Sequence, residues 1–227
     1  EICILIYVPN MHIIALRFED SRMTGGRESI MDMLTESEDV LQEQPKATRD
    51  SLLKGHQIRL TLPPNVTAAG VSINNIHVNR DIQISIKGIG KDYFTQYPIL
   101  GKSDNIEDVT YDSEDLVGVI DIMLDDVFEV SMSSEGEYIY LDFVNPHEIY
   151  DYVVVVDAGH GGNVPGATKM GVSEKDINLD IVLKLKKLFD RCDKNIGVYY
   201  TRTGDSSPSF ENRVGLANDT DADVFLS

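Results

Sequence analysis

The sequence predicts a mixed α/β protein: an N-terminal all-β, sandwich-like domain followed by part of a parallel-sheet α/β domain. Two patterns support this prediction. Between residues 54 and 148, apolar and polar residues alternate with a period of two, as in half-buried strands. From residue 152 the chain instead shows a β-α-β-α-β order that begins with an unbroken valine run. We therefore expect three segments, which are 1–53, 54–148 and 152–227.

The charge distribution also divides the chain near residue 152. The 227 residues include 38 acidic and 20 basic side chains, which gives a net charge of −18. Residues 153–227 hold 11 acids and 9 bases, so the first 152 residues hold the other 27 acids and 11 bases. We expect no nucleic-acid partner, because a chain with this net negative charge repels phosphate backbones. Two cysteines without a C-x-x-C motif argue against a disulfide scaffold and a thiolate zinc site.

Residues 1–53 are expected to be the remnant of an anchor or signal sequence followed by an acidic linker. The apolar stretch 2–16 is shorter than the about 20 residues that span a bilayer. It fits a buried strand or helix, or the trimmed end of a membrane anchor that lies upstream of residue 1. Residues 19–50 are predicted to be a linker with one short helix. Its weak apolar stripe consists of Ile30, Met33, Leu34 and Leu41.

Residues 54–148 are predicted to form the β-sandwich. Its alternating runs lie at 58–62, 82–86, 119–124 and 138–143. Turn signals separate these runs at Pro63-Pro64-Asn65, Asn74-Asn75, Asn79-Arg80-Asp81 and Ser134-Glu135-Gly136. We expect no long helix here, and we interpret His56 and His77 as ordinary strand or surface histidines.

Residues 152–227 are predicted to hold three parallel strands with right-handed crossovers. The strands are 153–156, 198–201 and 224–226. The first helix should start after Ser173, and its apolar stripe is Ile177, Ile181, Val182, Leu185, Leu188, Phe189 and Cys192. Cys192 is thus interpreted as a core residue. Ser207-Pro208 should cap a second helix whose inward residues are Phe210, Val214 and Ala217.

The chemistry is expected at the carboxyl ends of these strands. The loop Asp157-Ala158-Gly159-His160-Gly161-Gly162 places a histidine among glycines, which suits a metal ligand. A phosphate-binding loop does not fit, because the G-x-G-x-x-G spacing is absent. A structural glycine turn remains an alternative. Glu174 can serve either as a carboxylate at a helix N-terminus or as a metal ligand across from His160.

These motifs resemble a known family. The string VVVVDAGHGG, the triplet Glu174-Lys175-Asp176, and the later motifs Thr201-Arg202 with Asp205, Arg213, Ala217-Asn218 and Ala222 to Ser227 follow in order. They are similar to the zinc-dependent N-acetylmuramoyl-L-alanine amidases of bacterial cell walls, although Ala158 stands where that family usually has proline. The resemblance implies that His160 and Glu174 bind a zinc ion (Zn2+). It also implies a second zinc histidine and a catalytic glutamate, both beyond Ser227.

The remaining histidines do not complete this set. His147 precedes the strand that His160 follows, so the two should lie well over 10 Å apart at about 3.3 Å per residue. We therefore expect an incomplete zinc site and an inactive chain with an exposed sheet edge. Asp157 is expected either to orient His160 or to cap the loop. Arg202 and Arg213 are expected either to bind substrate carboxylates or to form structural ion pairs.

The resemblance implies a secreted peptidoglycan hydrolase of the autolysin type, which acts at the bacterial cell envelope in peptidoglycan catabolism. Zinc-activated water would cleave the amide bond between N-acetylmuramic acid and L-alanine. The β region is similar in strand pattern and position to the envelope-targeting domains that precede such amidases. A non-catalytic envelope-binding module with a degenerate amidase-like half is the alternative.

Overall fold

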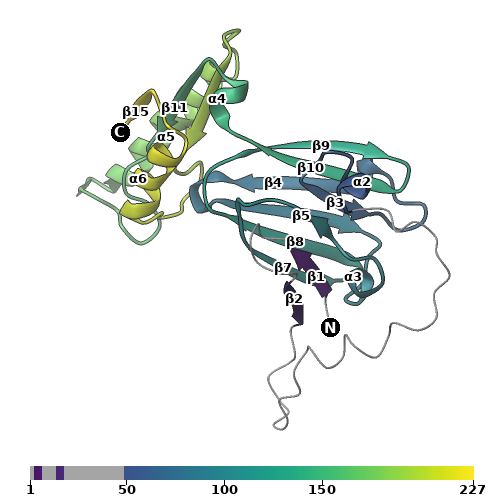
Figure 1. Cartoon of the computed structure of the whole chain (residues 1–227). Coiled ribbons are helices and arrows are strands. Elements are labelled where there is room, and N and C mark those ends of the chain that lie inside the picture. Colours follow the sequence, from purple (N-terminus) through teal and green to yellow (C-terminus); the bar gives the residue numbers. More distant parts are fainter. Residues whose placement is uncertain (1–2, 7–13, 18–48) are drawn as a thin grey trace, which may run out of the picture.

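The structure is a computed structural model that describes residues 3–6, 14–17 and 49–227. These residues form a mixed α/β protein, which confirms the predicted class (Figure 1). The apolar stripe and short helix expected within residues 19–48 lie outside the described part. Within the described part, no helix is long and apolar enough to cross a membrane.

The segment up to residue 144 is mainly β-structure. Its strands are β1 (Cys3–Ile6), β2 (Ile14–Arg17), β3 (Ile58–Thr61), β4 (Val71–Ile76), β5 (Asp81–Lys87), β6 (Leu100–Gly101), β7 (Ile106–Glu114), β8 (Val117–Leu124), β9 (Glu129–Glu135) and β10 (Tyr138–Val144). Its short helices are α2 (Arg49–Leu53), α3 (Tyr93–Gln96) and the 3-10 turns η1 (Ala68–Gly70) and η2 (His77–Asn79). No long helix interrupts residues 57–145, as the sequence predicts.

Two sheets pack on a shared core in this β region. One has the order β2-β1-β6-β3-β10-β9 and the other the order β4-β5-β8-β7. Period-two alternation turns every second residue of β3, β5 and β8 inward, so their apolar side chains meet between the sheets. The fully buried centre of this core is formed by Ile58, Leu60, Ile82, Ile84, Ile86, Ile120, Ile122, Leu124, Ile139 and Leu141.

Within residues 54–148, four strands were not predicted: β4, β6, β7 and β9. Strands β4, β7 and β9 are end members of their sheets, and β7 has only one buried residue while β4 and β9 have none. The turn expected at Asn74-Asn75 is wrong, because both residues lie within β4. There the Asn75 side-chain amide donates to the carbonyl of Phe128 at 2.7 Å, which explains a polar residue in a strand.

The α/β region follows directly. Its elements are α4 (Pro146–Ile149), β11 (Tyr152–Val156), β12 (Thr168–Lys169), β13 (Val172–Ser173), α5 (Glu174–Phe189), β14 (Ile196–Tyr200), α6 (Phe210–Asp219) and β15 (Val224–Leu226). The central strand β11 pairs in parallel with β14 and β15, as predicted. Val154 and Val156 pack toward Val182 of α5, whereas Val153 and Val155 pack toward Leu216 of α6. The two helices therefore cover opposite faces of the sheet.

The apolar stripe predicted for α5 is largely uncovered. Ser173 is the N-cap, but its side chain makes no capping hydrogen bond. Val182 is the buried residue of the helix, while Ile177 and Ile181 are each 50% exposed. The core role predicted for Cys192 is wrong, because the helix ends at Phe189 and this cysteine is exposed.

The inward face predicted for α6 is correct only for Ala217, which packs against the cluster around Leu216; Phe210 and Val214 are exposed. The helix is capped by Ser209, whose hydroxyl accepts the Asn212 amide at 3.1 Å, rather than by Ser207-Pro208. Phe210 is 82% exposed, and the buried side chains are Arg213 and Leu216. Hydrophobicity alone misplaced this face because one of its buried residues is a charged arginine held by hydrogen bonds.

Candidate metal site

His160 and Glu174 meet at the carboxyl edge of the three-stranded sheet. His160 lies on the loop after β11 in the left-handed region, with a φ of 59° that is uncommon for residues other than glycine. Glu174 is the first residue of α5. The imidazole Nε2 and the carboxylate Oε2 lie 3.4 Å apart, and their side chains are 36% and 45% exposed. The sequence therefore predicted correctly that these two side chains converge.

This spacing fits a zinc ion. Two ligands at about 2.0–2.2 Å from a tetrahedral zinc lie about 3.3–3.5 Å from each other. The donor chemistry also fits, because imidazole nitrogen and carboxylate oxygen are both zinc ligands. A Cβ atom on Gly166, which has a φ of +68°, would lie 2.7 Å from both Glu174 Oε2 and His160 Cδ2. Glycine at this position therefore leaves the space between backbone and donor pair open.

Glu174 is held by the chain segment that precedes it. Its Oε2 atom accepts the backbone amide of Ala167 at 2.9 Å, and its own amide donates to the Ala167 carbonyl at 2.9 Å. The β12–β13 hairpin between these two residues returns the chain to the start of α5. The carboxylate is thus oriented before any metal arrives.

Two buried arginines fix the His160 loop. Arg202 is 3% exposed and donates to the carbonyls of Ala158, Gly159, Lys175 and Gly204 at 2.7–3.0 Å. Burial lowers the pKa of its guanidinium. These bonds occupy most of the five N–H donors of the side chain, so Arg202 has a structural role in this conformation.

Arg213 and Asp157 form a buried ion pair, with side chains 11% and 8% exposed. Arg213 also donates to the carbonyls of Ala158 and His160, each at 2.8 Å. Asp157 further accepts the hydroxyls of Thr201 at 2.6 Å and Ser227 at 3.1 Å. Of the alternatives that the sequence left open, these contacts favour a structural ion pair for Arg213 and a loop-capping role for Asp157.

Sequence reasoning assigned no role to Lys175 and Asp205, although both stand in the motifs quoted above. Lys175 Nζ donates to both carboxylate oxygens of Asp205 at 2.8 and 3.0 Å and to the Gly162 carbonyl at 2.9 Å. Asp205 also accepts the Gly162 amide at 2.8 Å. The hydrogen bond from Lys175 is the main cause of the lowered pKa of Asp205. This pair connects the metal-site loop to the start of α5.

An open pocket of about 510 Å³ lies beside the donor pair. His160, Glu174 and Asn178 form its polar side, and its apolar side includes Ile181 of α5 and Leu226 of β15. Concave sites with an apolar wall and a few convergent polar groups are typical of ligand-binding sites. The pocket therefore gives a ligand access to the donor pair.

The other described histidines have partners elsewhere. His147 Nε2 contacts the Asp221 carbonyl at 2.8 Å, His56 contacts Asp142 at 2.6 Å, and His77 lies 3.3 Å from Glu129. His12 is outside the described residues. In the described ranges, no group of three or more His, Cys, Asp or Glu residues could hold a metal ion.

Comparison with known proteins identifies the segment that carries this site. Residues 154–227 match the N-acetylmuramoyl-L-alanine amidase family. A sporulation-specific N-acetylmuramoyl-L-alanine amidase of Bacillus subtilis is 38% identical over 74 residues, which cover 33% of this chain and 29% of the relative. The amidase CwlM of Bacillus licheniformis is 36% identical over 74 residues, with the same coverage. The chain thus spans less than a third of the length of these relatives.

One solved structure also matches over the same share of the chain. The catalytic domain of the amidase CwlV from Bacillus (Paenibacillus) polymyxa var. colistinus is 34% identical, and the match covers 33% of this chain and 42% of that one at a TM-score of 0.31. The family match and the sequence identities are the evidence for a relationship. Residues 154–227, which include the candidate metal site, are therefore similar to the N-acetylmuramoyl-L-alanine amidase family.

Proposed function

We propose that this chain is part of a peptidoglycan hydrolase that cleaves the amide bond between N-acetylmuramic acid and L-alanine. The observation that carries the proposal is the 3.4 Å separation of His160 Nε2 and Glu174 Oε2 at the carboxyl edge of the sheet. It is supported by the family match of the segment that contains both residues. Open α/β sheets bind ligands at this edge.

His160 and Glu174 would hold a zinc ion through one neutral nitrogen and one anionic oxygen. When bound, zinc would supply a Lewis acid that lowers the pKa of a water ligand to about 7. The chain's own contribution is orientation. Arg213 binds the backbone carbonyl of His160 and so holds the loop that carries the imidazole, and the Ala167 amide holds the Glu174 carboxylate, which lowers the entropic cost of binding.

Catalytic zinc sites use three protein ligands, and the donor pair supplies two. We propose that the third ligand and the proton-relaying glutamate come from beyond Ser227. On this proposal the 227-residue chain alone binds zinc weakly and does not cleave peptidoglycan.

We further propose that residues 54–148 form a β-sandwich domain that directs the enzyme to the bacterial cell envelope, with peptidoglycan as partner. The apolar core between the two sheets, whose buried side chains come from Ile58 to Phe143, supports this proposal. The 27 acids and 11 bases before residue 153 argue against direct docking on anionic wall polymers, so a bridging cation would be needed.

The test compares the 227-residue chain with a chain that continues past Ser227. Both are incubated with purified peptidoglycan and zinc, and newly freed L-alanine amino groups are counted. We expect release by the longer chain only, and loss of release in its His160→Ala variant. The control is His147→Ala, which removes a histidine outside the site. Release by His160→Ala at the unchanged rate would refute the proposal, and so would inactivity of the longer chain with zinc bound.

A further inference from the structure

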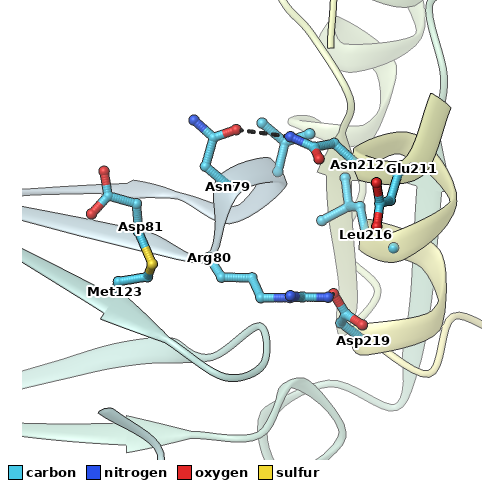
Figure 2. A pocket seen from close by; sticks show the side chains of 10 residues that line it. Asn79, Arg80, Asp81, Met123, Glu211, Asn212, Leu216 and Asp219 are labelled. Carbon is cyan, nitrogen blue, oxygen red and sulfur yellow. Dashed lines mark hydrogen bonds and ion pairs between the residues drawn. The ribbon is translucent and has the colours of Figure 1, made fainter. Parts of the chain in front are cut away.

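Helix α6 contacts both the β region and the metal-site loop. Its Leu216 side chain is buried against β11, in a cluster that also contains Val127 of the β region and Tyr199 of β14. Its Arg213 holds the His160 loop, and its Asp219 forms an ion pair with Arg80 of the β region. Figure 2 shows this side of α6 facing the turn after η2. The helix is therefore a physical connection between the two regions.

The Arg80–Asp219 pair is the polar centre of this contact. Both Nε and one terminal nitrogen of Arg80 lie 2.6 Å from Asp219 Oδ2, and the side chains are 40% and 18% exposed. The hydrogen bond with Asp219 raises the pKa of the guanidinium. Beside it, the Asn212 amide donates to Asn79 Oδ1 at 3.3 Å (Figure 2). Arg80 itself has a left-handed φ of 57°, which ends η2 and turns its side chain to α6.

Buried contacts next to this pair fix the same two regions. Tyr199 donates its hydroxyl hydrogen to Glu129 Oε1 at 2.7 Å, and the rings of His77 and Tyr199 form a T-shaped pair with centroids 4.8 Å apart. Burial is the main cause of a strongly raised pKa of the Tyr199 hydroxyl, which therefore stays a donor. Val127 is 1% exposed in the shared cluster. The two regions thus share a packed interface.

We propose that Arg80 is a positioning residue for the metal-site loop, acting through Asp219 and α6. Arg80 restrains the C-terminal end of α6 through Asp219, and Arg213, six residues earlier on the same helix, binds the His160 and Ala158 carbonyls. A shift of α6 would move Arg213 and loosen these bonds. The inference rests on the proposed function only in treating His160 as the working residue, and its test needs neither zinc nor substrate.

The test measures amide exchange by NMR in the 227-residue chain. The reporters are the Gly161 and Gly162 amides, which donate to Val164 and Asp205, and the Arg213 Nε–H, which donates to Pro208. In Arg80→Ala we expect about two- to fivefold faster exchange at these sites, as suits loss of one partly exposed ion pair. Exchange at the β5 and β8 amides should stay unchanged.

Two further variants separate positioning from general stability. Arg80→Asp combined with Asp219→Arg reverses the pair and should restore loop exchange to within about twofold of the original. Lys54→Ala removes an exposed ion pair of the β region, between Lys54 after α2 and Glu135 of β9, and should leave the loop unchanged. Three results would each overturn the inference. Exchange in the loop could be unchanged in a folded Arg80→Ala variant, or Lys54→Ala could speed it equally. The double variant Arg80→Asp with Asp219→Arg could also fail to restore it. If Arg80→Ala does not fold, Arg80→Lys must show the same loop-specific change in smaller degree, and its absence overturns the inference.

Discussion

The β region and the α/β region bury their apolar side chains to very different extents. In the β region, Ile82, Ile84 and Ile86 are fully buried between two sheets. In the α/β region, Ile181 is 50% and Leu188 64% exposed, and all three residues of β15 are more than 40% exposed. The expected exposed sheet edge at 224–226 is therefore present. Among the described residues, the β region thus encloses its apolar side chains between two sheets, whereas several apolar side chains of the α/β region are exposed.

This difference shows that the candidate site depends on polar contacts more than on a local hydrophobic core. The loop that carries His160 is held by Arg202, Arg213 and Lys175, whose donors reach its backbone carbonyls. Buried carbonyls require such partners, because an unpaired one costs about 1–3 kcal/mol. Two residues of the β region bind side chains of the α/β region: Arg80 binds Asp219, and Glu129 accepts the Tyr199 hydroxyl.

The largest effect is expected from Arg213→Met. It leaves the buried Asp157 carboxylate without its guanidinium and removes donors to two carbonyls. Removing one partner of a buried ion pair costs about 3–5 kcal/mol. Urea unfolding of the α/β region should show this loss. Arg191→Met, at an exposed position beyond α5, is the control and should change the unfolding free energy by less than about 0.5 kcal/mol. Equal effects of the two variants would contradict the claim that the polar contacts of Arg213 stabilise the α/β region.

A cavity in the β region should cost almost as much. Ile84→Ala empties a fully buried position in β5, and such truncations cost about 2–5 kcal/mol. Ile181→Ala removes the same atoms from a half-exposed position in α5 and should cost less than about 1 kcal/mol. Thermal unfolding of both variants measures the contrast. If the α5 variant lost as much stability, its face would be covered in solution, and the contrast between the regions would be wrong.

The interface should respond to pH through Glu129. Burial would raise the pKa of this carboxyl, but His77 and the hydrogen bond from Tyr199 outweigh it and hold the pKa below the ordinary 4.5. A lowered pKa stabilises the folded state above the unfolded value and loses that effect as the pH falls through the folded value.

Glu129→Gln keeps the shape of the side chain and removes its charge. It should cost about 1 kcal/mol at pH 7, because a hydrogen bond to a carboxylate is about twice as strong as a neutral one. The difference from the original chain should shrink below pH 4.5. Denaturant unfolding at pH 7, 5 and 3 gives the comparison. A difference that is constant with pH would exclude the charge of Glu129 as its source.

The smallest effect concerns Lys175. Lys175→Met removes the hydrogen bond that is the main cause of the lowered pKa of Asp205, so this pKa should rise toward its ordinary value of 3.8. NMR titration of the Asp205 carboxylate measures the rise. Lys184→Met removes a lysine paired with Asp180 on the exposed face of α5 and should leave the Asp205 titration unchanged. If the pKa of Asp205 did not change in Lys175→Met, Lys175 would not be one of the residues that hold the loop.

The parts that could be predicted from sequence are those where one physical rule dominates. Strands β5 and β8 and the valine strand β11 follow from apolar patterning, because central strands are buried on at least one face. The polar edge strands β7 and β9 lack this pattern, since only one face touches the core and few of their residues are buried.

The candidate site could be predicted only where it followed from motif residues and topology. His160 lies on the loop after β11, and Glu174 begins helix α5 after the β12–β13 hairpin, so the two side chains converge at the carboxyl edge of the sheet. The roles of Arg213, Lys175 and Asp205 could not be derived, because their partners are backbone carbonyls and amides that leave no pattern in the sequence. The burial of Arg213 explains why the predicted inward face of α6 was right for Ala217 but wrong for Phe210 and Val214.

The most direct test of the account is zinc titration observed at the histidine ring nitrogens by NMR. The claim is that His160 and Glu174 are a preformed donor pair, so the His160 ring signals should shift first and most, with the change at Nε2. The rings of His56, His77 and His147 should move little, and Glu174→Gln should weaken the His160 response. Shifts that are equal across the histidines, or a His160 response that survives Glu174→Gln unchanged, would contradict the claim.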